Sequence, residues 1–208
     1  ILADYGSTVI KIEKPGVGDD TRHWGPPYAK DADGNLTSEA AYYLSANRGK
    51  QSVTLDFAKP EGAALLRRLV AQADVLIENY KVGSLQKYGL DYESLKAINP
   101  RLIYCSITGF GQTGPYAARP GYDFAIQGIG GLMSITGERD ALPGGGPQKV
   151  GVAVVDVMTG MYASTAILAA LANRASTGLG RYIDVALLDV QVAMLANVGM
   201  NYLVGGTV

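Results

Sequence analysis

SVTLDFAKPEGAALLRRLVAQADVLIE, residues 52–78, predicts a strand, a helix and a second strand in direct succession. Its two ends, Ser52–Asp56 and Asp74–Glu78, are short runs rich in branched aliphatic residues, which is typical of buried strands. Between them Pro60 stands where a helix begins, and apolar residues over 63–70 repeat at helical spacing. This order is the unit from which parallel sheets are built, because a parallel connection needs a long crossover.

The same alternation continues on both sides of this unit. Further strands are expected at Thr8–Glu13, Leu102–Ile107 and Tyr182–Ala186. Helices are expected near Ala40–Leu44, at Tyr92–Ile98 behind an Asp91 cap, and at Tyr122–Met133, Val155–Asn173 and Val190–Leu203, with loops over 16–48 and 137–147. The sequence therefore predicts an α/β fold with a mostly parallel sheet and flanking helices.

The composition excludes several classes of protein. Of 208 residues, 48% are hydrophobic, which is enough to build a core and excludes wholesale disorder. The formal net charge of -1 gives no electrostatic support for nucleic-acid binding. Because the chain has one cysteine (Cys105) and one histidine (His23), we expect no internal disulfide and no metal site.

The segment Val155–Asn173 is apolar nearly all round, so we expect a buried helix. Its longest apolar stretch, Met161–Ala172, is shorter than the ~18 residues that a membrane span needs. We therefore expect no membrane association. The opening residues, Ile1–Tyr5, are typical of a last helical turn closed by Gly6, and we expect the chain to be an internal fragment of a longer protein.

A glycine-rich motif, Gly109–Gly114, matches the pattern of dinucleotide-binding loops and follows a predicted strand. That pattern requires a helix to open at once, so that the helix N-terminus can hold the pyrophosphate. Here Pro115 and Pro120 follow, with no apolar helical face between them. A connecting loop is the better interpretation, and a nicotinamide cofactor is not supported.

Two aspartates and a set of cations are the candidate functional residues. Asp156 lies in an apolar run, where an unpaired carboxylate is expensive to bury. It is either the cap of the following helix or a carboxylate held by the same N–H groups and aimed into a pocket, and Asp123 poses the same choice. Cations follow the predicted strands, as a polyphosphate ligand would require, although solvated surface charge explains them as well: Lys14, Arg22, Arg48, Lys50, Lys81 and Lys87.

Together these motifs resemble the class III CoA-transferases, the family of formyl-CoA transferase and carnitine CoA-transferase. The resemblance runs over essentially the whole chain. The segments that carry it are VIKIEKPG with Gly18-Asp19 and Thr21-Arg22 at 9–22, ENY with Gly83 and Gly89-Leu90 at 78–90, TGFGQTGP with Gly121-Tyr122-Asp123 at 108–123, and GVA with Asp156 and Gly160 at 151–160. Each segment alone is a weak signal, but their order and spacing together are specific.

The resemblance implies a protein about twice this length, with a Rossmann-like large domain, a smaller domain and two ring-shaped subunits interlocked as a homodimer. It implies a CoA-binding large-domain part over 1–189 and, over 190–208, a closing helix and the start of a linker. It implies that Asp156 is the catalytic nucleophile and that Tyr122 and Asp123 line the acyl site. By position, the implied CoA contacts are Lys14, Leu55, Asp56, Phe57, Ala58, Asn79, Tyr80, Lys81 and Lys87.

The activity implied is CoA transfer between an acyl-CoA and a free carboxylic acid through an aspartyl intermediate. Coenzyme A enters as substrate, and no tightly bound cofactor is expected. We expect a small carboxylate as the acceptor, with a dicarboxylate such as succinate as the leading candidate. A cytoplasmic location is expected, while mitochondrial and peroxisomal locations stay open.

Two alternatives remain. The related 2-methylacyl-CoA racemases pair a histidine after the third glycine loop with an aspartate that matches Asp156. Here Tyr122 takes the histidine's place, and phenol is a poor base at neutral pH, which favours the transferase. The other alternative is a non-catalytic CoA-binding fragment.

Overall fold

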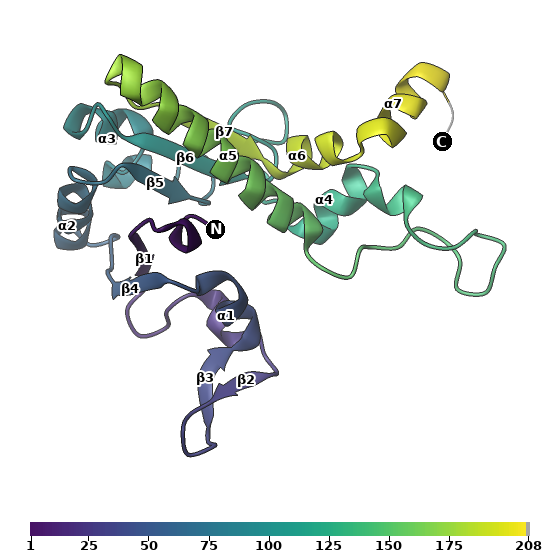
Figure 1. Cartoon of the computed structure of the whole chain (residues 1–208), viewed down its shortest axis with the longest axis horizontal. Coiled ribbons are helices and arrows are strands. Elements are labelled where there is room, and N and C mark those ends of the chain that lie inside the picture. Colours follow the sequence, from purple (N-terminus) through teal and green to yellow (C-terminus); the bar gives the residue numbers. More distant parts are fainter. Residues whose placement is uncertain (207–208) are drawn as a thin grey trace. The chain divides into compact units, whose positions relative to one another are not determined.

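The computed structural model describes residues 1–206 and shows two compact units, Ile1–Leu66 and the part that begins at Arg67. Each unit combines parallel strands with helices, as the sequence predicted (Figure 1). Helix α2 (Pro60–Val70) contains the boundary between the two units. It begins at the proline, as expected, because a first-turn proline loses no helical hydrogen bond.

The first unit contains a parallel pair and an antiparallel hairpin. Strands β1 (Val9–Glu13) and β4 (Lys50–Thr54) pair in parallel. The hairpin of β2 (Tyr28–Lys30) and β3 (Leu36–Ala40) falls within the predicted loop 16–48, so that prediction is wrong. The remaining elements are η1 (Ala3–Tyr5), η2 (Asp20–His23) and α1 (Ala41–Asn47).

The second unit is built on a three-stranded parallel sheet in the order β5-β6-β7. The strands are β5 (Val75–Glu78), β6 (Ile103–Thr108) and β7 (Tyr182–Ala186), each within two residues of its predicted ends. Between β5 and β6 lie η3 (Gln86–Tyr88) and α3 (Tyr92–Ile98). Helix α3 is capped as predicted, since the Asp91 carboxylate accepts the N–H of Ser94 at 3.2 Å.

Helix α5 (Val154–Thr177) packs on β6, β7 and α6, and Figure 1 shows it running along the sheet. Only one stripe of the helix is buried, and its members recur every three or four residues: Val155, Thr159, Ala163, Ile167, Ala170 and Arg174. Apolar side chains on the other faces are exposed, such as Val157 at 59% and Leu168 at 55%. Within residues 1–206 the predicted buried helix is thus buried along one stripe only, and its other faces are exposed.

By length and composition, α5 could cross a membrane, since its 24 residues include an 18-residue window with a mean hydropathy of 1.6. The expectation that the apolar stretch of this segment is too short to span a membrane is therefore wrong as regards length. Within residues 1–206, α6 and α7 meet the same measure only as a pair bent by 79°. The stripe that α5 packs on β6 and β7 is what a core helix of an α/β fold presents to its sheet.

The other two predicted helices are each broken into two elements. The predicted helix 122–133 is α4 (Asp123–Ile129) followed by η4 (Leu132–Ile135), with Gly131 at φ 89° between them. The predicted helix 190–203 is α6 (Leu187–Met194) and α7 (Ala196–Gly205). The predicted domain boundary after residue 189 falls inside α6 and stays a prediction, and residues 207–208 lie outside the described part.

Candidate active site

The junction of α4 and α5 is organised by the carboxylate of Asp123, which is only 6% exposed. Its Oδ1 accepts the backbone N–H groups of Val155 at 2.8 Å and Asp156 at 3.1 Å. These are two of the N–H groups that the start of α5 leaves without a helical partner. Asp123 therefore caps α5 from 32 residues upstream, where its negative charge also opposes the positive end of the helix dipole.

Gln127, which is fully buried, completes this arrangement. Its Nε2 donates to Oδ2 of Asp123 at 2.5 Å, and its Oε1 accepts the N–H of Val150 at 2.9 Å. One amide thus fixes both the cap and the loop that leads into α5. A buried apolar cluster also joins α4, α5 and α6, and it consists of Ile126, Val155 and Leu187.

Asp156 occupies the first turn of α5, and its side chain lies near the surface. The N–H groups that could have held its carboxylate are taken by Asp123, so Asp156 is not the cap, and those groups do not hold it ionised. Within residues 1–206 no side chain bonds its carboxylate. Partial burial and, secondarily, the charge of Asp123 raise the pKa of Asp156 above its usual value. Asp156 is thus a free carboxylate on a fixed backbone.

The glycine loop between β6 and α4 is closed where Gly109 and Gly121 meet. A Cβ at Gly109 would lie 2.4 Å from Cα of Gly121, and one at Gly121 would lie 2.3 Å from Cα of Gly109. Only hydrogen fits between these backbones, which explains the glycine at both positions. Tyr122 follows directly and is 72% exposed, while Asp123 turns inward.

In the first unit, the predicted CoA contacts gather at the carboxyl ends of β1 and β4. Lys14 follows β1 and is exposed, and 55–58 follow β4. The N–H of Leu55 bonds the carbonyl of Glu13 at 2.9 Å, and Oδ1 of Asp56 accepts the N–H of Ala58 at 3.1 Å. The parallel pair therefore brings Lys14 and 55–58 to one edge, where α/β proteins bind ligands.

A partly buried ion pair, which no sequence pattern indicated, holds this edge. Arg22 donates to both carboxylate oxygens of Glu13, at 2.8 and 2.9 Å, and also bonds Glu39 and Tyr43. Glu13 additionally accepts from Ser52 at 2.7 Å. These bonds, led by that from Arg22, hold the pKa of Glu13 well below its usual value. The pair fastens the segment after β1, which contains Lys14.

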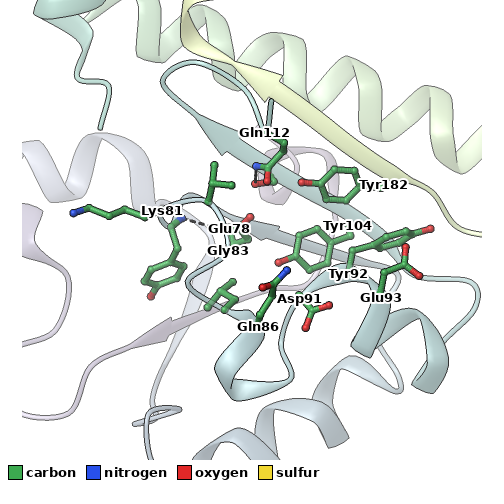
Figure 2. Close-up of a pocket in the computed structure, with 14 residues that line it drawn as sticks. Glu78, Lys81, Gly83, Gln86, Asp91, Tyr92, Glu93, Tyr104, Gln112 and Tyr182 are labelled. Atoms are coloured by element: carbon green, nitrogen blue, oxygen red, sulfur yellow. Dashed lines mark hydrogen bonds between the residues drawn. The ribbon is translucent and has the colours of Figure 1, made fainter. Parts of the chain in front are cut away.

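In the second unit, the predicted CoA contacts 79–81 follow β5 beside a cavity of about 260 Å³, whose lining does not include Asn79. Tyr80 and Lys81 line it, and Figure 2 shows the Lys81 side chain extending away from the tyrosines opposite. Lys87 lies apart on η3, where its Nζ is 4.8 Å from the centre of the Tyr88 ring. The structure thus brings Tyr80 and Lys81 to one cavity and leaves Lys87 outside its lining.

The opposite wall of the cavity comes from side chains that the sequence analysis did not single out. Tyr92, Tyr104 and Tyr182 pack with ring centres 5.2 to 5.9 Å apart (Figure 2). Glu78 lies beside them, and burial raises its pKa. Burial and the charge of Glu78 also raise the pKa of Tyr104. One sequence signal could have indicated this wall: side chains alternate between the two faces of β6, which places Tyr104 and Ser106 on the same face.

With this geometry established, comparison with known proteins decides the family. The family model described as CoA-transferase family III matches residues 1–208. The chain belongs to CoA-transferase family III. Among curated proteins, this family III chain is 60% identical over 206 residues to the succinate–glutarate CoA-transferase of Agrobacterium fabrum, covering 99% of the chain and 50% of that protein.

Human succinyl-CoA:glutarate CoA-transferase is 47% identical over 204 residues, covering 98% of the family III chain and 44% of the human protein. The chain therefore spans about half the length of the curated relatives it matches. Among solved structures, a CAIB/BAIF family protein from Brucella suis superposes with a TM-score of 0.92 at 59% identity, covering 99% of this chain and 52% of that one. These matches confirm the family resemblance and the α/β fold.

Proposed function

We propose that the full-length protein transfers CoA between the thioester of one dicarboxylic acid and the free carboxylate of another, with succinate and glutarate as the leading pair. The observation that carries this proposal is the 60% identity, over 99% of the chain, to a relative named for these two acids. The human relative, named for the same acids, supports it. Coenzyme A is a substrate in this proposal.

Asp156 is proposed as the nucleophile, because it is a free carboxylate on a backbone that Asp123 fixes. Its oxygen attacks the thioester carbonyl and expels CoA thiolate, which leaves a mixed anhydride of Asp156 and the donor acid. The thiolate then attacks the aspartyl carbonyl of the anhydride. This step releases the donor acid and forms an aspartyl-CoA thioester.

The acceptor carboxylate next attacks that thioester and gives a second mixed anhydride and CoA thiolate. Attack of the thiolate on the acceptor's carbonyl yields the new acyl-CoA and restores Asp156. Every step exchanges one acyl bond for another, so the thioester energy is retained. A raised pKa suits the nucleophile, because a more basic carboxylate is a better one.

Asp123 has a defined place in this proposal. Its capping bonds fix the backbone of Asp156, and its charge adds to the effect of burial in raising the pKa of the Asp156 carboxylate. Backbone N–H groups of the glycine loop are proposed to stabilise the oxyanion of each tetrahedral step. The interlocked homodimer, cytoplasmic location and remaining CoA contacts stay predictions that follow from the family resemblance.

The test is CoA exchange by the purified full-length protein. Succinyl-CoA is offered with a panel of mono- and dicarboxylic acids, and each new acyl-CoA is identified by mass. We expect glutaryl-CoA to form fastest and acetyl-CoA to form slowly. Treatment with succinyl-CoA and then hydroxylamine should convert Asp156 to a hydroxamate, visible in the peptide mass. A hydroxamate on Asp123 or Glu78 instead would disprove the assignment of the nucleophile.

A further inference from the structure

A row of polar residues crosses the middle of the three-stranded sheet, where apolar side chains are the rule for a parallel sheet. Ser106 on β6 is paired in register with Glu78 on β5 and with Asp184 on β7. Paired residues on neighbouring strands share a face, so these three side chains form one row. Ser106, at its centre, is only 1% exposed.

The glycine loop folds back onto this row through Gln112. Its side-chain Nε2 donates to Oγ of Ser106 at 2.9 Å, and its backbone N–H donates to Oδ2 of Asp184 at 2.9 Å. Figure 2 shows Gln112 among the residues that line the cavity. A Cβ on the preceding Gly111 would lie 3.6 Å from the same Asp184 oxygen, so the loop lies directly against β7.

Glu78 connects the row to the other loop. Its Oε2 accepts the N–H of Tyr80 at 2.8 Å, which fixes the turn that begins the predicted CoA-contact segment 79–81. Its carboxylate belongs to the residue that pairs in register with Ser106, and both residues line the cavity. Because Gln112 donates to the Ser106 oxygen, the Ser106 proton is available to Glu78. The contacts therefore lead from Gln112 through Ser106 to its register partner Glu78.

We propose that Ser106 and Gln112 are positioning residues that hold the CoA-contact segment 79–81 and the glycine loop 109–114 in one fixed arrangement. The proposal rests on the proposed function, because it assigns segment 79–81 to CoA. Neither residue takes part in the chemistry. Loss of the Gln112–Ser106 bond frees the two loops to move independently, so CoA must order them when it binds, and its affinity falls.

The test uses three variants of the full-length protein: Ser106→Ala, Gln112→Leu and the double variant. Each single change should raise KM for the acyl-CoA and Kd for free CoA about tenfold, with kcat changed less than twofold, because ground-state binding is lost. The double variant should be no worse than either single one, since the two residues act as a unit. Gln112→Glu keeps the side-chain volume but removes the donor, and should behave like Gln112→Leu.

Ser164→Ala is the matched control, because it also deletes a hydroxyl, one that bonds the carbonyl of Gly160 inside α5 at 2.8 Å. Ser164→Ala should leave KM for the acyl-CoA and Kd for free CoA unchanged. The proposal would be overturned if the fold-changes of the two single variants multiplied in the double variant. It would also be overturned if the variants lowered Tm but left KM and Kd unchanged. Calorimetric titration with CoA needs no turnover, so a wild type that binds CoA without transferring it refutes the proposed function alone. A wild type that binds no CoA refutes both.

Discussion

Replacing Asp123 by asparagine should expose a conflict between hydrogen-bond donors at the α4–α5 junction. The new Oδ1 can still accept the N–H groups of Val155 and Asp156, which now bond Asp123. The new Nδ2 then faces Nε2 of Gln127, where a carboxylate oxygen now accepts a bond of 2.5 Å. Turning the Gln127 amide over moves the conflict to the N–H of Val150, which Gln127 now accepts. One buried donor is left without a partner in either case.

The cost follows from the buried environment. Asp123 is 6% exposed and Gln127 is fully buried, so water does not replace the lost acceptor. A buried unsatisfied donor costs about 1–3 kcal/mol, and the lost charge at the helix start adds about 0.5 kcal/mol. We expect Asp123→Asn to lower the free energy of unfolding by about 2 kcal/mol, measured by urea denaturation of the full-length protein.

A second change restores the pattern. In Asp123→Asn with Gln127→Glu, the new Nδ2 donates to one glutamate oxygen, and the other accepts the N–H of Val150. Every hydrogen bond of the wild type is matched, so most of the lost stability should return. Gln127→Glu alone should be destabilising, because two carboxylates then face each other. Asp140→Asn, in the exposed loop 137–147, is the control and should change nothing.

The result that would refute this reasoning is a double variant no more stable than Asp123→Asn. The cap would then depend on the charge at position 123, and the donor–acceptor order through Gln127 would carry little of the stability. Equal stability of wild type and Asp123→Asn would show that the contacts of Asp123 contribute nothing measurable.

Four shorter predictions accompany this one. Asp156→Asn should bind CoA but lose transfer, and Asp156→Glu should lose about 100-fold in kcat, as its oxygen moves by about 1 Å. Tyr122 should not support racemisation, so a 2-methylacyl-CoA should gain no deuterium in heavy water. Burial raises the pKa of Glu78 above 4.5, so its contribution to stability is present below pH 4.5 and lost as the pH rises through the folded-state pKa. Glu78→Gln should remove this loss of stability, which urea titrations at several pH values measure. Arg22→Met should lower the free energy of unfolding by about 3–5 kcal/mol, because the buried charge of Glu13 loses its partner. The lowered pKa of Glu13 also predicts that the pair's contribution to wild-type stability falls as the pH drops below the unfolded-state pKa of 4.5.

Local signals explain the parts of the fold that the sequence predicted correctly. Helix α3 begins behind Asp91 because the cap and the helix are neighbours in the chain. The strands of the parallel sheet stand out as short aliphatic runs, and all three were found. The hairpin of β2 and β3 was missed because β2 has only three residues and the segment is rich in glycine, proline and aspartate. Such short strands acquire their structure by pairing.

The covered side of α5 could not be predicted, because an apolar residue carries no sign of which face meets the sheet. The stripe from Val155 to Arg174 is selected by packing on β6 and β7. The register of the strands in the sheet likewise could not be predicted from the sequence. The row of Glu78, Ser106 and Asp184 exists only because three strands align at those residues.

The two aspartates show most clearly where local pattern fails. Both stand at the start of a helix, and both were equally plausible as cap or as free carboxylate. The structure separates them through contacts over 32 and 33 residues, in which Asp123 takes the N–H groups of Val155 and Asp156. A carboxylate that already accepts three donors is a poor candidate for attack on a thioester, since each bond stabilises its charge. Asp156 makes no such bonds within residues 1–206, and partial burial, with a smaller contribution from the charge of Asp123, raises its pKa. The division between a capping aspartate and one whose carboxylate is free is therefore a property of the α4–α5 contact, and it supports the proposal that Asp156 is the nucleophile.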